Sequence, residues 1–281
     1  REATAAELMA NSSYDPTDED KILRVSKSSF MAYLYCPRKY WWEKVQLKDI
    51  RPPATPAMIR GIKVHDALEK LYDVWEGQQY LRPLFDLDEH TECIQAIADM
   101  EERRMEEWGV EFFKPYEVEE KRCFYDEEYD IVIVGKIDGV LNHPEGGLCI
   151  LELKTGNFND NKISKTRLEL CFYERMVRLM GEEKPVTHFA LMGPDADNEK
   201  MLNKLLNTRG KVVMSGKTQG IMFVEKVTSR SMNRFSEKFA DAMQRLKDED
   251  WSMNWNDYTC PEWCDFNLAC EQELDEGDVD W

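Results

Sequence analysis

Two acidic residues and a lysine lie in two apolar, strand-like segments in the middle of the chain. Asp138 lies within the first segment, 131–141, and Glu152 and Lys154 lie near the end of the second. If the segments form a hairpin that is symmetrical about Glu145, Asp138 lies directly opposite Glu152, with the two side chains about 5 Å apart on one face. Lys154 shares that face about 7 Å further along the strand. A register slip of one residue would instead place the two carboxylates on opposite faces.

Facing carboxylates repel each other, so such a pair needs a positive charge between its members. Oxygen ligands suit Mg²⁺ or Mn²⁺, and the neighbouring ammonium group of Lys154 would orient a water molecule and stabilise negative charge in a transition state. The competing interpretation is an ordinary hairpin with polar residues on its solvent face. Both segments consist mostly of Val, Ile and Leu, which predicts burial, and buried acids and lysines need a compensating partner.

Two helical segments carry further candidates. His65 lies within the segment 57–78, and Glu169 and Tyr173 lie one turn apart on one face of the segment 163–180. Taken alone, a histidine or tyrosine among apolar neighbours is more often a core residue than a ligand or catalyst. They become candidate site residues only because, together with Asp138, Glu152 and Lys154, they occur in the same chain order as the residues of a known motif set.

The cysteines form a second constellation. Three of the eight, Cys260, Cys264 and Cys270, fall within eleven residues near the end of the chain, and Cys36 is the proposed fourth member. Four thiolates can hold an iron–sulfur cluster or a zinc ion, and this set would tie the two ends of the chain together. The other four are expected to be reduced core residues, which predicts a reducing, cytoplasmic compartment: Cys93, Cys123, Cys149 and Cys171.

Hydrophobic periodicity supplies the elements that must position these residues. It predicts helices at 26–42, 57–78, 88–108, 163–180, 197–206 and 229–249. It predicts strands at 115–125, 129–142, 147–155, 187–192 and 220–227. The pattern favours an α/β fold with a mixed central sheet, flanking helices and a helical N-terminal region.

These motifs resemble those of a known superfamily. The segment 135–138 followed by Glu152-Leu-Lys154 resembles the PD-(D/E)xK nuclease core, which implies a restriction-endonuclease-like fold. The segment Gly61-Ile-Lys-Val-His65 resembles the Gly-x-x-x-His helix motif of the RecB-like branch. The segment 168–173 resembles the Gln-x-x-x-Tyr motif of that branch, with Glu169 in place of the usual Gln.

The resemblance implies roles for individual residues. One or two divalent metal ions would be bound by three side chains and one backbone carbonyl: His65, Asp138, Glu152 and the carbonyl of Leu153. Lys154 would position or deprotonate a water molecule. Tyr173, together with Glu169, would support the site or the substrate backbone.

The split cysteines extend the resemblance to the iron–sulfur RecB-family nucleases. These include the CRISPR-associated RecB-like exonucleases and the AddB nuclease domain, in which four such cysteines bind a [4Fe–4S] cluster. The likeness spans residues 26–270 and includes an opening helix that carries Cys36. The first gap of the C-terminal triplet holds three residues where the family commonly has two, and zinc remains a competing ligand.

Charge and composition limit the choice of function. The net charge of −18 argues against broad nucleic-acid affinity, but basic residues gather at 27–63 and at 154–167, which permits a local basic groove. No long uncharged apolar run predicts a membrane span. Residues 1–21 are expected to form a polar tail, and residues 22–281 a single nuclease domain with a helical part (22–110), a catalytic α/β core (111–228) and a C-terminal cluster-binding segment (229–281).

The sequence therefore predicts a metal-dependent DNA nuclease. By resemblance, its preferred substrate is single-stranded DNA digested from an end, with the iron–sulfur cluster as a structural clasp and other DNA-processing proteins as possible partners, as in CRISPR adaptation or DNA repair. The alternative is a non-cleaving subunit that binds DNA ends for a larger complex. A redox sensor is a third and weaker hypothesis.

Overall fold

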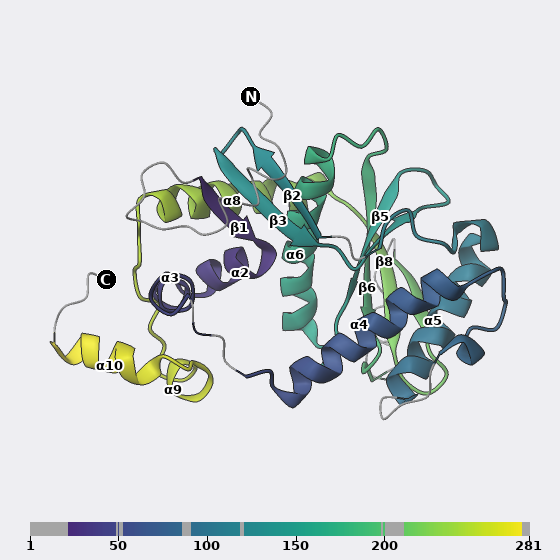
Figure 1. Cartoon of the computed structure of the whole chain (residues 1–281), viewed down its shortest axis with the longest axis horizontal. Helices are drawn as coiled ribbons and strands as arrows, with labels where there is room; N and C mark the ends of the chain where they lie inside the picture. The colour runs from purple at the N-terminus through teal and green to yellow at the C-terminus, as the bar shows by residue number, and fades with distance from the viewer. Residues whose placement is uncertain are drawn as a thin grey trace. The chain divides into compact units, whose positions relative to one another are not determined.

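The computed structural model describes residues 22–48, 50, 53–85, 91–118, 121–197, 199 and 211–276. The chain divides into two compact units (Figure 1). The first unit comprises 1–52, 123–135 and 233–281, and the second comprises 53–122 and 136–232. The expected single domain over 22–281 stays a prediction. None of the described helices is both long and apolar enough to cross a membrane.

The second unit contains a five-stranded mixed sheet. Its strand order is β4 (Gly139–Asn142), β5 (Leu148–Leu153), β6 (Val186–Gly193), β8 (Ile221–Lys226) and β7 (Lys211–Ser215). β5 and β6 run parallel, whereas the other neighbouring strands are antiparallel. Every residue of β5 is buried, as expected of a strand that is covered on both faces of a sheet. The predicted mixed central sheet is confirmed.

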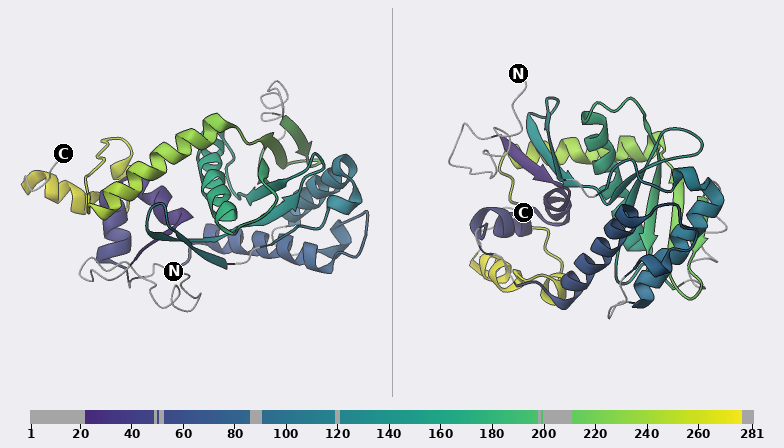
Figure 2. Two further views of the ribbon diagram at one scale, coloured as in Figure 1. Left: turned by 90° about the horizontal axis from the view of Figure 1, so that it is seen from above. Right: turned by 45° about the vertical axis from the view of Figure 1, so that its right-hand side comes forward.

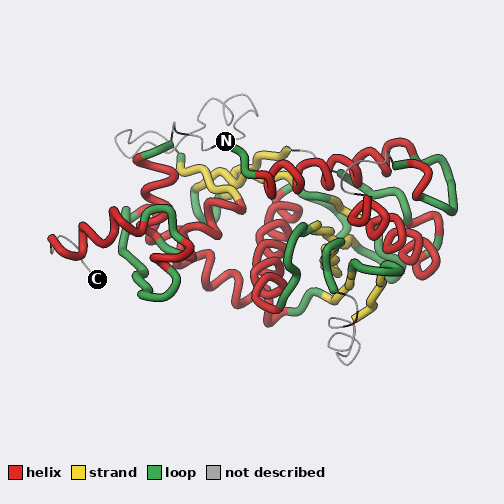
Figure 3. The backbone as a smooth tube through the Cα atoms, turned by 90° about the horizontal axis from the view of Figure 1, so that it is seen from below, coloured by secondary structure: helices red, strands yellow, loops and turns green. Residues whose placement is uncertain are grey.

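In the described part of the chain, helices cover both faces of this sheet. α6 (Asp160–Leu179) packs against β5 and β6 on one face, and α4 (Pro56–Val74) and α5 (Thr91–Trp108) lie on the other (Figures 1 and 2). α4 begins where Thr55 accepts a hydrogen bond from the Met58 amide, with Pro56 in its first turn. α6 begins where the Asn159 side chain accepts a hydrogen bond from the Lys162 amide. Helices and strands therefore form three layers in this unit (Figure 3).

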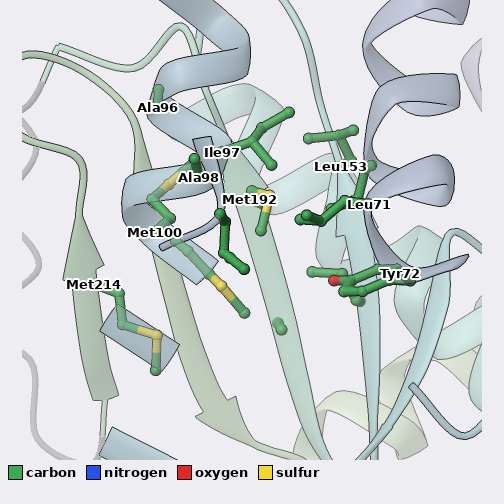
Figure 4. Packing of buried hydrophobic residues seen from close by; sticks show 14 of the residues in the cluster. Leu71, Tyr72, Ala96, Ile97, Ala98, Met100, Leu153, Met192 and Met214 are labelled. Atoms are coloured by element: carbon green, nitrogen blue, oxygen red, sulfur yellow. The ribbon is translucent and has the colours of Figure 1, made fainter. Parts of the chain in front are cut away.

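A hydrophobic core of the second unit lies between the sheet and the α4–α5 pair. Leu71 and Tyr72 of α4, Ile97 and Met100 of α5, and Leu153 of β5 are among its members (Figure 4). Alternate residues of β5 point to opposite faces of a sheet. Because Leu151 and Leu153 belong to this core, Glu152 points to the other face, where α6 lies.

The predicted hairpin register is confirmed, but the predicted strand 129–142 is wrong. Gly139 pairs with Leu151, and Asn142 pairs with Leu148, so the pairing is symmetrical about Glu145. The segment is nevertheless two strands in two different sheets, β3 (Ile131–Lys136) and β4, interrupted at Ile137 and Asp138. Apolar residues occur on both sides of this break, and hydrogen bonds to different partner strands divide the segment.

The first unit contains a three-stranded sheet and most of the helices at the two ends of the described chain. β1 (Leu23–Ser26) runs parallel to β3, whose other neighbour is β2 (Lys121–Asp126). α2 (Lys27–Tyr35) begins at Ser26 with a capping box, which confirms the predicted helix start. Phe30 of α2 packs edge-on against Phe235 and Phe239 of α8 (Ser229–Lys247).

Several elements differ from the sequence prediction. The single helix expected at 26–42 is interrupted at Cys36, because the proline that follows disfavours helical backbone before it and cannot donate a backbone hydrogen bond. α3 (Pro37–Trp41) and the π-helical turn η1 (Trp42–Gln46) follow. Strands β1 and β7 were missed. Most of the helix predicted at 197–206 lies outside the described residues.

Candidate active site

The site begins at the break between β3 and β4. Asp138 precedes β4, and its Oδ2 accepts a hydrogen bond from the Leu153 amide at 2.7 Å. Its Oδ1 lies 3.2 Å from Nδ1 of His65. Asp138 is therefore fixed at the end of the hairpin that the register predicts, and it contacts one of the proposed helix residues.

Gly61 lies where α4 approaches the end of β5. A Cβ atom on Gly61 would stand 3.4 Å from Oγ1 of Thr155, the residue that follows Lys154, which is van der Waals contact. This part of the helix therefore lies close to the turn that follows β5. The spacing from Gly61 to His65 is about one helical turn, which places both residues on the same face of α4.

Lys154 lies between two buried carboxylates. Its Nζ is 2.6 Å from Oε1 of Glu152 and 2.6 Å from Oε2 of Glu169. The Glu152 side chain is 1% exposed and that of Glu169 is 8% exposed, whereas the lysine side chain is 20% exposed. β5 supplies Glu152, and α6 supplies Glu169, so the ammonium group joins the sheet to the helix. The carboxylate at position 169 contacts the site.

Tyr173 lies one turn after Glu169 and joins α6 to Lys136, the last residue of β3 before the break. Its hydroxyl donates to the backbone carbonyl of Lys136 at 2.7 Å. Burial raises the pKa of Tyr173 well above its ordinary value, and the nearby carboxylates of Glu152 and Asp138 raise it further. The hydroxyl therefore stays protonated and acts as a hydrogen-bond donor at neutral pH.

An ionic cluster that sequence reasoning missed fixes the turn after Lys154. Asp195 follows β6, and its carboxylate accepts hydrogen bonds from the Gly156 amide at 2.5 Å, from both terminal nitrogens of Arg60 and from the Cys93 thiol at 2.7 Å. Burial alone would raise the pKa of Asp195, but these donors outweigh it and lower the pKa to about 2. Arg60 directly precedes Gly61, so the cluster ties α4 to the turn. No local sequence signal pairs residues 60 and 195.

The four cysteines of the second constellation all lie in the first unit. Cys36 separates α2 from α3, Cys260 begins α9 (Cys260–Trp263), Cys264 follows that helix, and Cys270 lies in α10 (Asn267–Glu276). Burial, together with the nearby Glu273, Cys264 and Cys36, raises the pKa of the Cys270 thiol to about 11. Cys264 and Cys36 therefore both lie near Cys270.

Protein contacts already join the two ends of this unit. Arg38 lies 3.4 Å from Glu273, and its amide donates to the Ser252 carbonyl at 3.1 Å. The Trp42 ring stacks on Phe266, with centroids 6.1 Å apart, between the second and third cysteines of the triplet. Trp42 therefore packs within the cysteine segment. The [4Fe–4S] cluster and its four ligands stay predictions.

Among the described residues, no group of three or more His, Cys, Asp or Glu side chains lies in metal-binding geometry. The side chains present nevertheless have suitable chemistry for Mg²⁺ or Mn²⁺: Asp138 with the His65 imidazole beside it, and the Glu152 carboxylate near the end of the paired strand β5. The residues that would hold the ion are His65, Asp138 and Glu152, with the Leu153 carbonyl. The four thiols of the first unit are soft ligands that suit iron–sulfur or zinc.

Comparison with known proteins gives one family. The PD-(D/E)XK nuclease superfamily matches residues 24–271, which includes every candidate residue of both constellations. No curated protein matches the chain. Among solved structures, one titled "Crystal structure of SSO0001" aligns with a TM-score of 0.43 and 14% identity, over 92% of this chain and 91% of the other. The family match confirms the predicted α/β, restriction-endonuclease-like fold class.

Proposed function

Because the chain belongs to the PD-(D/E)XK nuclease superfamily, we propose that it hydrolyses DNA with a divalent metal ion bound at Asp138 and Glu152. The observation that carries this proposal is the convergence of three separate elements. α4, the β4–β5 hairpin and α6 bring His65, Asp138, Glu152 and Lys154 to one end of the sheet. This is the end that a substrate strand would have to reach.

The residues of the site have separate tasks in this proposal. Mg²⁺ or Mn²⁺, when bound, would supply a more acidic water molecule and neutralise charge on the phosphate. Asp138 is held for that purpose by the Leu153 amide and faces His65. Lys154 presents a fixed positive charge beside Glu152, where it would orient the attacking water or the phosphate oxygens. Tyr173 keeps α6, and with it Glu169, in place through the Lys136 carbonyl.

The finer assignment is also a proposal. The sequence resemblance to iron–sulfur RecB-like nucleases supports single-stranded DNA as the preferred substrate and digestion from an end. Cys36, Cys260, Cys264 and Cys270 would hold a [4Fe–4S] cluster that stabilises the first unit. The contacts between Arg38 and Glu273 and between Trp42 and Phe266 support a structural role, because they already pack the same segments together.

The test is digestion of end-labelled single-stranded and double-stranded DNA by the purified protein with Mn²⁺, Mg²⁺ or EDTA. We expect metal-dependent release of short products from single strands, and loss of this activity in Asp138→Asn. Absorption spectra and iron and zinc analysis after anaerobic purification test the cluster separately. Tight binding of DNA ends without any cleavage in Mn²⁺ would favour the non-cleaving end-binding subunit instead.

A further inference from the structure

Lys162 differs from the other cations around the site in what its charge contacts. Lys154 pairs with Glu152 and Glu169, and Arg60 pairs with Asp195. The ammonium group of Lys162 instead donates to a neutral acceptor, the backbone carbonyl of Thr155. Within the described part of the chain, Lys162 forms no ion pair.

Two hydrogen bonds, one from the backbone amide of Lys162 and one from its ammonium group, fix the position of this side chain. Lys162 lies in the first turn of α6, where its amide donates to the capping side chain of Asn159 at 3.0 Å. Its Nζ reaches back to the turn after β5 and lies 3.8 Å from the place where a Cβ atom on Gly156 would stand. Gly156 has a φ of +77°, so the turn itself favours glycine. The lysine therefore holds its charge directly beside the turn that carries Lys154.

This arrangement is electrostatically unfavourable without a further anion. The Lys162 side chain is partly buried, and burial lowers its pKa, as does the nearby positive charge of Lys154. The Asp195 and Glu169 carboxylates offset this only in part. A half-buried cation placed beside another cation gains most from a ligand that carries negative charge.

We propose that Lys162 binds a phosphate group of the substrate strand next to the one that is cleaved. This inference rests on the proposed nuclease function, which supplies the anion: a polynucleotide carries one phosphate per nucleotide. Lys154 directly precedes the Thr155–Gly156 turn, and the Lys162 ammonium group donates to the Thr155 carbonyl, so in this proposal both contact the strand backbone. Lys162 acts through its charge and not through base recognition, so its contribution is independent of sequence.

The experiment measures binding rather than cleavage. A fluorescently labelled single-stranded oligonucleotide is titrated with the full chain by anisotropy, with Ca²⁺ as the divalent cation and at several salt concentrations, and a gel confirms that the strand stays intact. Loss of one phosphate contact lowers the slope of log affinity against log salt by about 0.7 for a single strand. We expect Lys162→Met to weaken binding about tenfold at low salt and to show this change in slope.

Matched variants separate charge from structure. Lys184 is a suitable control, because its Nζ also donates to a neutral oxygen, Oδ1 of Asn142, and it precedes β6 at the other end of the sheet. Lys184→Met should leave affinity and slope unchanged, and Lys162→Arg should retain most of the binding. Lys162→Gln retains a donor for the Thr155 carbonyl but no charge, so it should behave as Lys162→Met does, with an unchanged thermal midpoint.

Three results would overturn the inference: an unchanged slope in Lys162→Met, an equal change in Lys184→Met, or full binding by Lys162→Gln. The readout also separates this inference from the proposed function. Cleavage by the wild-type protein together with an unchanged slope in Lys162→Met would remove only the phosphate contact. Binding that depends on Lys162, without cleavage in any metal, would remove the nuclease activity and leave the strand contact.

Discussion

Two buried glutamates in the second unit are paired with cations in different ways. Glu101 and Arg104 lie one turn apart in α5 with their side chains 0% exposed, and the guanidinium group also donates to the carbonyls of Phe112 and Phe113. Glu152 shares the ammonium group of Lys154 with Glu169, and the lysine is 20% exposed. The first pair has matched charges, whereas the second is a cation between two acids at the end of a sheet.

This difference in charge and exposure separates a structural cluster from a cluster that can bind a ligand. A buried ion pair in which each guanidinium nitrogen donates to a protein acceptor fixes packing, and it offers little to a ligand. A partly exposed cluster in which two acids share one ammonium group can take up a further cation. Charge that is unbalanced in the protein alone is a mark of a functional site. Neutralising each glutamate in turn should therefore give opposite results.

The largest effect on stability is expected from Glu101→Gln. The change leaves Arg104 buried with the charge of its partner Glu101 removed, which costs about 3–5 kcal/mol when a buried pair is broken. Urea denaturation measures this cost. Nuclease activity of the protein that remains folded should stay near the wild-type value. A loss below 1 kcal/mol would mean that the pair does not fix the packing of α5.

Glu152→Gln should give the reverse result. Lys154 keeps Glu169 as a partner, and the repulsion between the two acids disappears, so the free energy of unfolding should stay within about 1 kcal/mol of wild type. Metal-dependent cleavage should fall by ~100-fold or more, because a proposed metal ligand is lost. If Glu152→Gln unfolds as readily as Glu101→Gln, the contrast between the two clusters fails.

Asp195 extends the comparison to a third cluster. Its carboxylate positions the turn after Lys154, and the positive charge of Arg60 matches its negative charge. Its pKa is lowered from 3.8 to about 2, so its ionised form stabilises the folded protein above pH 4, and this contribution is lost as the pH falls through 2. The shift corresponds to roughly 2 kcal/mol. The difference in unfolding free energy between wild type and Asp195→Asn should therefore be constant from pH 5 to 7 and shrink below pH 4. A difference that is the same at pH 3 and pH 7 would contradict this account.

The smallest effect is expected from Glu169→Gln. Glu152 remains 2.6 Å from Lys154, so the ammonium group keeps a charged partner and its position. We expect cleavage to fall by less than about tenfold, and the Mn²⁺ concentration for half-maximal rate to rise, because one negative charge near the metal is lost. A loss as large as that of Glu152→Gln would show that both acids are needed equally.

The sequence predicted the central hairpin well because the information is local. Two apolar runs joined by the short polar turn after Asn142 predict a hairpin, and its symmetrical register places Asp138 opposite the end of β5. The same continuous apolar run could not show that the strand is interrupted at Ile137. That break depends on β1, a strand of four residues whose partner β3 lies more than a hundred residues away.

What the sequence alone determined is the set of reactive side chains and the elements that carry them, because residue spacing fixes which side chains share a face. The tertiary structure decided how those elements meet. The approach of Gly61 to Thr155, the hydrogen bond from Tyr173 to Lys136 and the pairing of Arg60 with Asp195 join segments that are distant in the chain. Contacts of this kind depend on close packing of whole elements, and no local pattern encodes them.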